Sequence, residues 1–435
     1  MEPLFLSVIC GCNAGLFREA LHEIYIPRIQ RGNDSFAANV LGARGPLLST
    51  LVHFFEQGRW GTLVRNCSEG QDLAAEDQLF ILVEAAAYLT AERGSGAPEA
   101  RICYERAESL CHSLDRPLLL YVTLIGQWRH TLGTDRLSAA MQVAERAYSL
   151  ARKQHYPTQM IWAYNALAAT LFFLGDFEST QQFAMRGVEI WHSGGSQSQW
   201  GDVDTPVVGC LCYQAVSEWL LGGVASCQAT MAEAISLAKK QNDMHALALA
   251  LAYAAVLAYF ERNPAEVERY SSDLIELSTR HHFAQWIAIG SMHRGWACSA
   301  SGDAAEGIAW IEGGIRDWMA TGSVLAMPYN LALKAEALYL AHRTAEALEA
   351  INEAEALVER FEDRHWCAEL HRLRGVFLAA MGADETQIEV SFCAAISIAK
   401  EQKSVSLENR AEATYAEYRR QKASGSSGHG LRLPL

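Results

Sequence analysis

The sequence predicts an all-α protein, a right-handed α-solenoid of helix hairpins with a period of about 40 residues. The main evidence is one stretch that occurs almost twice, at residues 231–241 and 392–402, with starts 161 positions apart. Related segments at 311–315 and 351–355 lie one 40-residue step apart between them. Because 161 is close to four such steps, the chain has the fixed period that is typical of helical repeat arrays.

Composition supports this fold class and argues against some functions. Half of the 435 residues are apolar and only ten are proline, which allows extensive burial and favours helix. The formal net charge of −14 argues against a nucleic-acid binder, which needs a basic surface, and against docking on an anionic membrane. We therefore predict a cytoplasmic protein with no direct nucleic-acid or membrane partner.

The eleven cysteines indicate a reducing compartment. Their number is odd, and most of them lie within apolar helical patterns, which is not the arrangement of a disulfide framework. No run of the sequence reaches about 18 uncharged apolar residues, so we expect no membrane-spanning helix. Residues 3–12 are apolar but too short to span a bilayer.

The N-terminal region has weaker patterns than the rest of the chain. Residues 1–15 contain glycines that suggest a loop, and residues 16–29 have the apolar spacing of an amphipathic helix. Pro27 should kink or end that helix, because proline lacks the N–H that the helix needs. Residues 47–55 predict another helix, and a second one is expected to start at Trp60.

From residue 75 each unit has an apolar helix A, a short turn often marked by glycine, and an amphipathic helix B. A small residue recurs in the middle of helix B, where a bulky side chain would overpack the helix contact by about 1–3 kcal/mol. Leu274 is the exception, so we expect a wider contact there. The aligned positions are Ala107, Ala147, Gly187, Ala234, Leu274, Gly314, Ala354 and Ala395.

These positions follow at steps of 40, 40, 47, 40, 40, 40 and 41, so one unit carries seven extra residues. The polar 193–204 loop is the obvious place for them. Insertions in a solenoid form loops on one face, and that face often binds. A tolerated surface insertion explains the loop as well, because long surface loops cost little. Trp200, Asp202 and Asp204 are the residues that a binding role would use.

The patterns divide the chain into four parts. Residues 1–73 are N-terminal helices, for which a degenerate repeat is one interpretation, and residues 74–403 are the repeat array. Residues 404–421 predict a capping helix with a polar outer face. The Gly/Ser-rich residues 422–435 predict a disordered tail.

Motifs for catalysis are missing. Gly-Lys never occurs, which excludes a phosphate-binding P-loop, and no Gly-x-Ser-x-Gly elbow is present. His22-Glu23 is not followed by a second histidine at zincin spacing, because position 26 is Ile. His281-His282 ends a B helix, where cations suit the helix C-terminus. We predict no enzyme, no catalytic residue and no cofactor.

Two cysteine pairs and six tryptophans were the remaining candidates for a site. Cys10 and Cys12, and Cys210 and Cys212, could ligate a soft metal, but residues two apart on a helix point away from each other. We therefore predict no metal ligand. The tryptophans fit core positions, and only those on the concave side of A helices would form a ligand platform. They are Trp128, Trp162, Trp219, Trp286, Trp296 and Trp310.

At the level of single units the chain resembles tetratricopeptide repeats, lengthened to about 40 residues. The segments 369–375, 382–385 and 392–399 resemble the closing repeats of large bacterial signalling proteins known as predicted ATPases, and residues 97–108 resemble an early repeat. In that family a cyclase or winged-helix domain often precedes an ATPase module, and a tetratricopeptide-like array ends the chain. The resemblance covers roughly residues 16–420. It implies the array alone, because the cyclase, P-loop and DNA-binding residues are missing.

Three functional hypotheses follow. The first is a non-enzymatic interaction or sensor scaffold in signalling, whose concave groove, lined by A helices, binds a peptide or regulatory protein. The alternative is a regulatory C-terminal arm of an adenylate cyclase or ATPase system, with catalysis supplied by another domain or chain. The third is an enzyme with a site near the 193–204 loop, which is least favoured because catalytic sites need convergent titratable groups.

Overall fold

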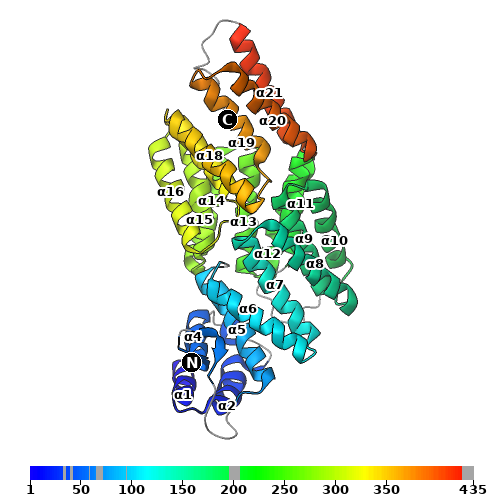
Figure 1. Cartoon of the computed structure of the whole chain (residues 1–435), viewed down its shortest axis with the longest axis vertical. Coiled ribbons are helices and arrows are strands. Elements are labelled where there is room, and N and C mark those ends of the chain that lie inside the picture. The colour runs from blue at the N-terminus through cyan, green and yellow to red at the C-terminus, as the bar shows by residue number, and fades with distance from the viewer. Residues whose placement is uncertain are drawn as a thin grey trace.

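A computed structural model of the chain describes residues 1–32, 36–39, 43–57, 59–64, 72–94, 96–194 and 206–423. The molecule is elongated, with the N-terminal helices at one end and the last helices at the other (Figure 1). Apart from one two-stranded hairpin, the secondary structure of the described residues is helical. The predicted all-α repeat fold is confirmed.

The repeat array begins at Ala75 and consists of helices in consecutive pairs, which pack as hairpins. A final helix, α21 (Val405–Ala423), packs on the last hairpin, so the helix extends beyond the predicted cap to Ala423. The remaining residues of the predicted tail lie outside the described ranges. The hairpins are α5 (Ala75–Arg93) with α6 (Pro98–Ser113), α7 (Pro117–Thr134) with α8 (Leu137–Gln154), α9 (Pro157–Leu174) with α10 (Phe177–His192), α11 (Pro206–Leu220) with α12 (Val224–Gln241), α13 (Met244–Phe260) with α14 (Pro264–His281), α15 (Ala284–Ala300) with α16 (Ala304–Ala320), α17 (Met327–Leu340) with α18 (Thr344–Phe361), and α19 (Cys367–Ala380) with α20 (Glu385–Glu401).

Local sequence explains where these helices start and stop. The side chains of several N-cap residues accept a backbone N–H of the first turn, which satisfies a group that the helix leaves unpaired. They are Asp176, Asp243, Asn263, Asp303 and Asp384. Several helices end at a residue in the left-handed conformation, which turns the chain into the next helix. They end at His155, Gly175, Asn242, His282 and Glu362.

The aligned positions in the B helices are all buried, as expected for contact positions. A Cβ added to Gly314 would lie 2.7 Å from the carbonyl oxygen of Ala288, so α16 and α15 approach closely there. The wider contact expected at Leu274 is not found between α14 and α15. Gly290 supplies the small residue from the partner helix, and a Cβ on it would lie 3.3 Å from the carbonyl oxygen of Ser271.

The N-terminal region differs from its prediction at three places. The predicted loop in residues 1–15 is mostly helix α1 (Glu2–Asn13). The helix α2 (Phe17–Glu19) continues as a π-helix (Ala20–Gln30), so Pro27 does not end it. After the helices α3 (Phe36–Asn39) and α4 (Arg44–Leu51) and a 3₁₀ turn (Val52–Phe54), strands β1 (Phe55–Glu56) and β2 (Arg59–Leu63) form an antiparallel hairpin.

The helix predicted from Trp60 is therefore wrong. Trp60, Thr62 and Val64 alternate along the segment, which is the spacing of a strand and not of a helix. Trp60 packs its ring against Phe55 with centroids 5.2 Å apart, and its carbonyl accepts a hydrogen bond from Cys103 Sγ. Contact with α6 thus fixes the hairpin against the first repeat.

The second half of the array folds back on the first half. The backbone N–H of Val324 donates to the carbonyl of Gly133 at 2.8 Å, and that of Arg364 donates to the carbonyl of Phe173 at 2.7 Å. Ser404 Oγ donates to the carbonyl of Leu220 at 3.0 Å. Each contact joins a loop or helix start in the second half to the end of an A helix nearly five hairpins earlier. The superhelix therefore closes on itself, which neighbour-to-neighbour packing alone does not produce.

The two adjacent glycines of α16 give a matched test of the helix contact. Gly314→Ala should destabilise the protein by about 1–3 kcal/mol, because the new methyl group meets the α15 backbone. Gly313→Ala should stabilise it by about 0.5–1 kcal/mol through helix propensity, since only Arg316 Nη2, at 3.7 Å, lies near that position. Urea denaturation of both variants measures the difference. Equal effects would contradict the close approach at Gly314.

Candidate functional site

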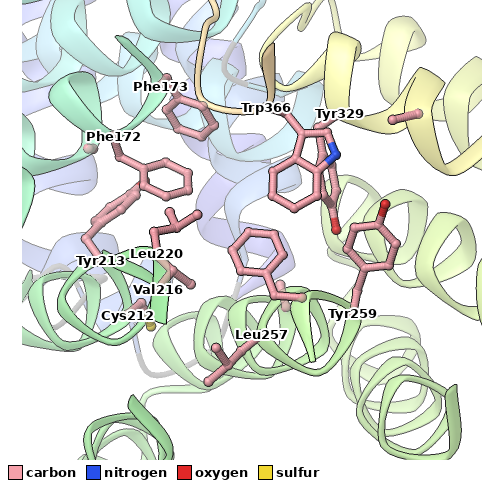
Figure 2. Close-up of a cluster of buried hydrophobic side chains, with 14 of the residues drawn as sticks. Phe172, Phe173, Cys212, Tyr213, Val216, Leu220, Leu257, Tyr259, Tyr329 and Trp366 are labelled. Atoms are coloured by element: carbon pink, nitrogen blue, oxygen red, sulfur yellow. The ribbon is translucent and has the colours of Figure 1, made fainter. Parts of the chain in front are cut away.

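The inner faces of the A helices, predicted to line a groove, form a closed core. In α11 every residue except Gln214 is buried, and α13 and α17 are buried over most of their length. Figure 2 shows Phe172, Phe173 and Tyr213 on one side of this core and Tyr329 and Trp366 on the other. In this conformation the faces that would contact a partner contact each other.

The first and second halves of the array form two turns of the superhelix, and aromatic rings from both turns meet in this core. Trp366, in the loop between α18 and α19, stacks on Phe260 with centroids 4.6 Å apart and planes 12° apart. Tyr259 packs edge-on against Trp296 at 4.8 Å and against Tyr329 at 5.5 Å. Such pairs contribute about 0.5–1.5 kcal/mol each beyond the area that they bury. The aromatic contacts therefore stabilise the closed superhelix.

A buried network of charges lies beside the aromatic core. Arg262, which follows α13 with a positive φ of 59°, bonds two carboxylates of the other turn. Its Nη1 lies 2.5 Å from Glu336 Oε2 and its Nη2 lies 2.6 Å from Glu369 Oε1. Arg372 donates two hydrogen bonds to Glu369, at 2.7 and 2.9 Å. We call Arg262, Glu336, Glu369, Arg372 and Arg410 the ion network.

The donors around each carboxylate explain how the charges can be buried. Glu336 also accepts bonds from the Tyr259 hydroxyl at 2.5 Å and from Trp296 Nε1 at 3.1 Å. Arg410, on the cap helix α21, lies 3.5 Å from Glu369 and donates to the carbonyl of Phe260. Burial opposes the ionised form of Glu369, but the neighbouring Arg372 and Arg410 hold its pKa well below its ordinary value. Both carboxylates are thus fully paired inside the protein.

Two histidines complete the polar part of the core. His365 Nδ1 lies 2.6 Å from Asp363 Oδ1, and Asp363 Oδ2 accepts the backbone N–H of Ala326 at 2.9 Å. His293 Nδ1 lies 2.9 Å from the carbonyl of Ile289, which can only accept, so Nδ1 carries the proton. Its Nε2 then accepts from the Tyr329 hydroxyl at 2.8 Å. Burial lowers the pKa of His293 to about 4, so this imidazole is neutral.

The structure places the six candidate tryptophans in two groups. Trp219 and Trp296 belong to the closed core, and Trp128 and Trp286 are buried between helices. Trp162 and Trp310 are half-buried, and each lies under an arginine, Arg129 and Arg294 respectively. None of the six forms an exposed platform facing a groove.

Cysteines and the 193–204 loop were the remaining candidates for a site. Among the described residues no three His, Cys, Asp or Glu side chains could hold a metal ion together. Cys210 and Cys212 are buried, which raises the pKa of both thiols, and Cys10 is exposed while Cys12 is buried. Of the 193–204 loop, Trp200, Asp202 and Asp204 lie outside the described residues.

Sequence reasoning missed the ion network and Trp366. A signal was present, because Glu336, Glu369 and Arg372 are charged residues on the apolar A helices α17 and α19, where burial makes an unpaired charge costly. The sequence signal for Arg262 is weaker, since this residue lies in the connection between α13 and α14 and not on an apolar helix. A surface depression of about 590 Å³ lies elsewhere, between β2 and α6, and is lined by charges of both signs.

The fold and the closed core define a class: a helical-repeat protein built from tetratricopeptide-like hairpins. No protein-family model matches the chain. An uncharacterised protein of Rhizobium meliloti (strain 1021) is 26% identical over 266 residues, which cover 60% of this chain and 26% of that protein. The chain therefore spans about a quarter of the length of this curated relative. No helix that the structure describes is long and apolar enough to cross a bilayer.

Two solved structures resemble the chain. A Rap protein complexed with competence and sporulation factor overlays with a TM-score of 0.54 at 10% identity, covering 82% of this chain and 96% of that one. This overlay supports the shared fold. A signal transduction ATPase with a tetratricopeptide repeat sensor from Pyrococcus horikoshii gives a TM-score of 0.40 at 10% identity, covering 99% and 74%. That score is too low to support an argument.

The ion network predicts that the same substitution at two glutamates, one buried and one exposed, changes the stability of the protein unequally. Glu369→Gln removes one of two buried carboxylates from among three buried arginines, so it should destabilise the protein by about 3–5 kcal/mol. Glu346→Gln breaks an exposed pair with Arg343 and should leave the unfolding midpoint nearly unchanged. Guanidinium denaturation compares the two variants. A small effect at Glu369 would mean that its carboxylate is not the buried partner of these arginines.

His293 predicts a pH dependence of stability. Its pKa falls from 6.5 in the unfolded chain to about 4 in the folded one, so the unfolded chain binds more protons between these values. Its contribution is fully present above pH 6.5 and is lost as the pH falls towards 4, by about 3 kcal/mol in total. His293→Gln should flatten the pH profile of the unfolding free energy by that amount. Identical slopes for the two proteins would refute the assignment.

Proposed function

We propose that this chain is a non-enzymatic interaction scaffold of a cytoplasmic signalling system, which takes a peptide or regulatory protein on the inner face of its superhelix. One observation carries the proposal. The second turn meets the first through loops and helix ends around Val324, Arg364 and Ser404, and through side chains of the aromatic core and the ion network. In a solenoid each hairpin packs on its sequence neighbours. The two turns can therefore separate while every hairpin stays folded.

The residues on the inner face suit protein recognition. Tyrosine, tryptophan and arginine are the side chains that dominate binding energy at protein interfaces, and Tyr259, Trp296 and Arg262 meet here. In the closed form these groups are satisfied by the chain itself. A partner that binds only the open form then has an apparent affinity lowered in proportion to the fraction of open molecules.

The comparisons add support at the level of the fold. The Rap protein with this fold was solved in complex with competence and sporulation factor. A repeat array of this kind can thus hold such a factor. The free cysteines of the described residues suit a reducing compartment such as the cytoplasm.

The second candidate is a regulatory C-terminal arm of an adenylate cyclase or ATPase system. The observation that favours it is the length of the Rhizobium meliloti relative, of which the match covers only 26%. Sequencing the DNA upstream of the Met1 codon decides between the two. An open frame that encodes a P-loop or cyclase domain supports the arm, whereas an in-frame stop codon supports a free-standing scaffold.

A covalent lock tests whether binding requires the turns to part. Lys403 Nζ lies 2.5 Å from Glu178 Oε2, and this exposed pair joins the two turns. Carbodiimide treatment should link the two side chains and reduce the affinity for peptides selected on the untreated protein by at least about tenfold, because the open form is no longer accessible. Fluorescence anisotropy measures the loss.

The matched control is Lys403→Arg, which keeps the charge pair but cannot form the amide with Glu178. After the same treatment it should bind the selected peptides like the untreated protein. If the locked wild-type chain retains full affinity, the inner face is not the binding surface. If no peptide can be selected on the untreated protein, the scaffold proposal itself fails.

A further inference from the structure

The surface formed by α8, α9 and α10 carries three aromatic rings in mutual contact. Tyr164 of α9 lies between Tyr148 of α8 and Phe183 of α10, with centroids 5.6 and 6.0 Å away. The ring centroids of Tyr148 and Phe183 lie 6.4 Å apart. All three rings are partly exposed, so solvent or a partner can reach them. Aromatic groups that remain accessible in this way are typical of protein interfaces.

Two arginines flank these rings. Arg152 of α8 lies over the ring of Tyr148 with its Cζ 5.8 Å from the centroid, and Arg186 of α10 lies over Phe183 at 5.5 Å. Burial and the neighbouring Tyr148 raise the pKa of Tyr164, while both arginines act to lower it. Tyr164 thus lies between the two rings that these arginines cover, one from each neighbouring helix. We call Tyr148, Arg152, Tyr164, Phe183 and Arg186 the arginine–aromatic patch.

The two arginines differ from three other outward arginines of the array. Arg269, Arg280 and Arg343 each bond a glutamate three or four residues away on their own helix or beside it. Within the described parts of the chain, neither Arg152 nor Arg186 has a carboxylate oxygen within 4 Å, although α8 and α10 carry several glutamates. In a chain with a formal net charge of −14, two unpaired cations over aromatic rings form a local positive site.

We propose that the arginine–aromatic patch is a second interaction surface, which binds an acidic segment of a partner protein. Carboxylates of the partner beside Arg152 and Arg186 would form the ion pairs that the described part of the chain does not provide. An apolar side chain next to it in the partner would cover Phe183. Charge-assisted bonds from arginine and contacts with tyrosine are the usual core of such interfaces.

This surface is separate from the inner face of the superhelix. Arg152 and Arg186 are exposed in the closed form, so binding here needs no separation of the turns. The chain could then hold one partner on its outer surface in either conformation. The patch is tested without any assumption about the function of the inner face.

The probe is a short fluorescein-labelled peptide of glutamates around a central tryptophan, with a glutamine-for-glutamate peptide beside it. Fluorescence anisotropy should show saturable binding of the glutamate peptide to the full chain, and binding should weaken as salt screens the charges. Arg152→Glu with Arg186→Glu should reduce the affinity by at least about tenfold. Both side chains are exposed, so the variant should keep its helical circular dichroism and its melting temperature.

The matched control is Arg269→Glu with Arg343→Glu, which changes the net charge of the protein equally, on α14 and at the start of α18. It should bind the glutamate peptide within about twofold of the wild type. Equal losses in the two double variants would show that only net charge matters and would overturn the proposal. Failure of the glutamate peptide to bind, or equal binding of the glutamine peptide, would overturn it as well.

The carbodiimide-locked chain separates this proposal from the one for the inner face. The lock joins Lys403 to Glu178 and leaves the arginines of the patch unmodified, so the locked chain should bind the glutamate peptide as the untreated chain does. Loss of that binding on locking would show that the patch is not an independent surface.

Discussion

The closed form of the superhelix depends on the buried side chain of Glu369. It bonds Arg372 of its own helix and Arg262, which follows α13 in the first turn, and Arg410 of α21 lies close by. One buried carboxylate thus connects the two turns with the cap helix. Its charge could not be buried without these partners, because an isolated ion in a protein interior costs several kcal/mol, on the order of the whole stability of a domain. The turns, the aromatic core and the network therefore form together.

The fold was predictable because its signal is local and repeated. Every unit presents the same pattern of an apolar helix, a turn and an amphipathic helix, and each contact position such as Gly314 or Ala354 faces a sequence neighbour. The N-terminal region lacks this redundancy. A single segment such as that from Trp60 offers one short pattern, and its pairing with Phe55 and packing on α6 decide its structure.

The closed interior was not predictable from the same patterns. An apolar A helix such as α13 has the same composition whether its inner face lines a groove or packs against another turn. The small rotation between successive hairpins decides between these two arrangements. Added up over nearly five units, it brings Arg364 into contact with Phe173. The informative residues were the exceptions to the pattern. Glu336 and Glu369 break the apolar faces of α17 and α19 because they meet charges from residues far away in the sequence.

The chemical character of this closure bears on how the protein can work. Aliphatic contacts between the turns would be non-directional and would tolerate several registers, whereas the bonds of Arg262 to Glu336 and Glu369 require one. Buried ion pairs add little net stability, since desolvation offsets most of their attraction, and apolar replacements are often equally stable. The network therefore fixes how the turns meet more than how tightly they are held. A superhelix closed in this way keeps one defined closed form, and the outer patch around Tyr164 remains accessible in that form.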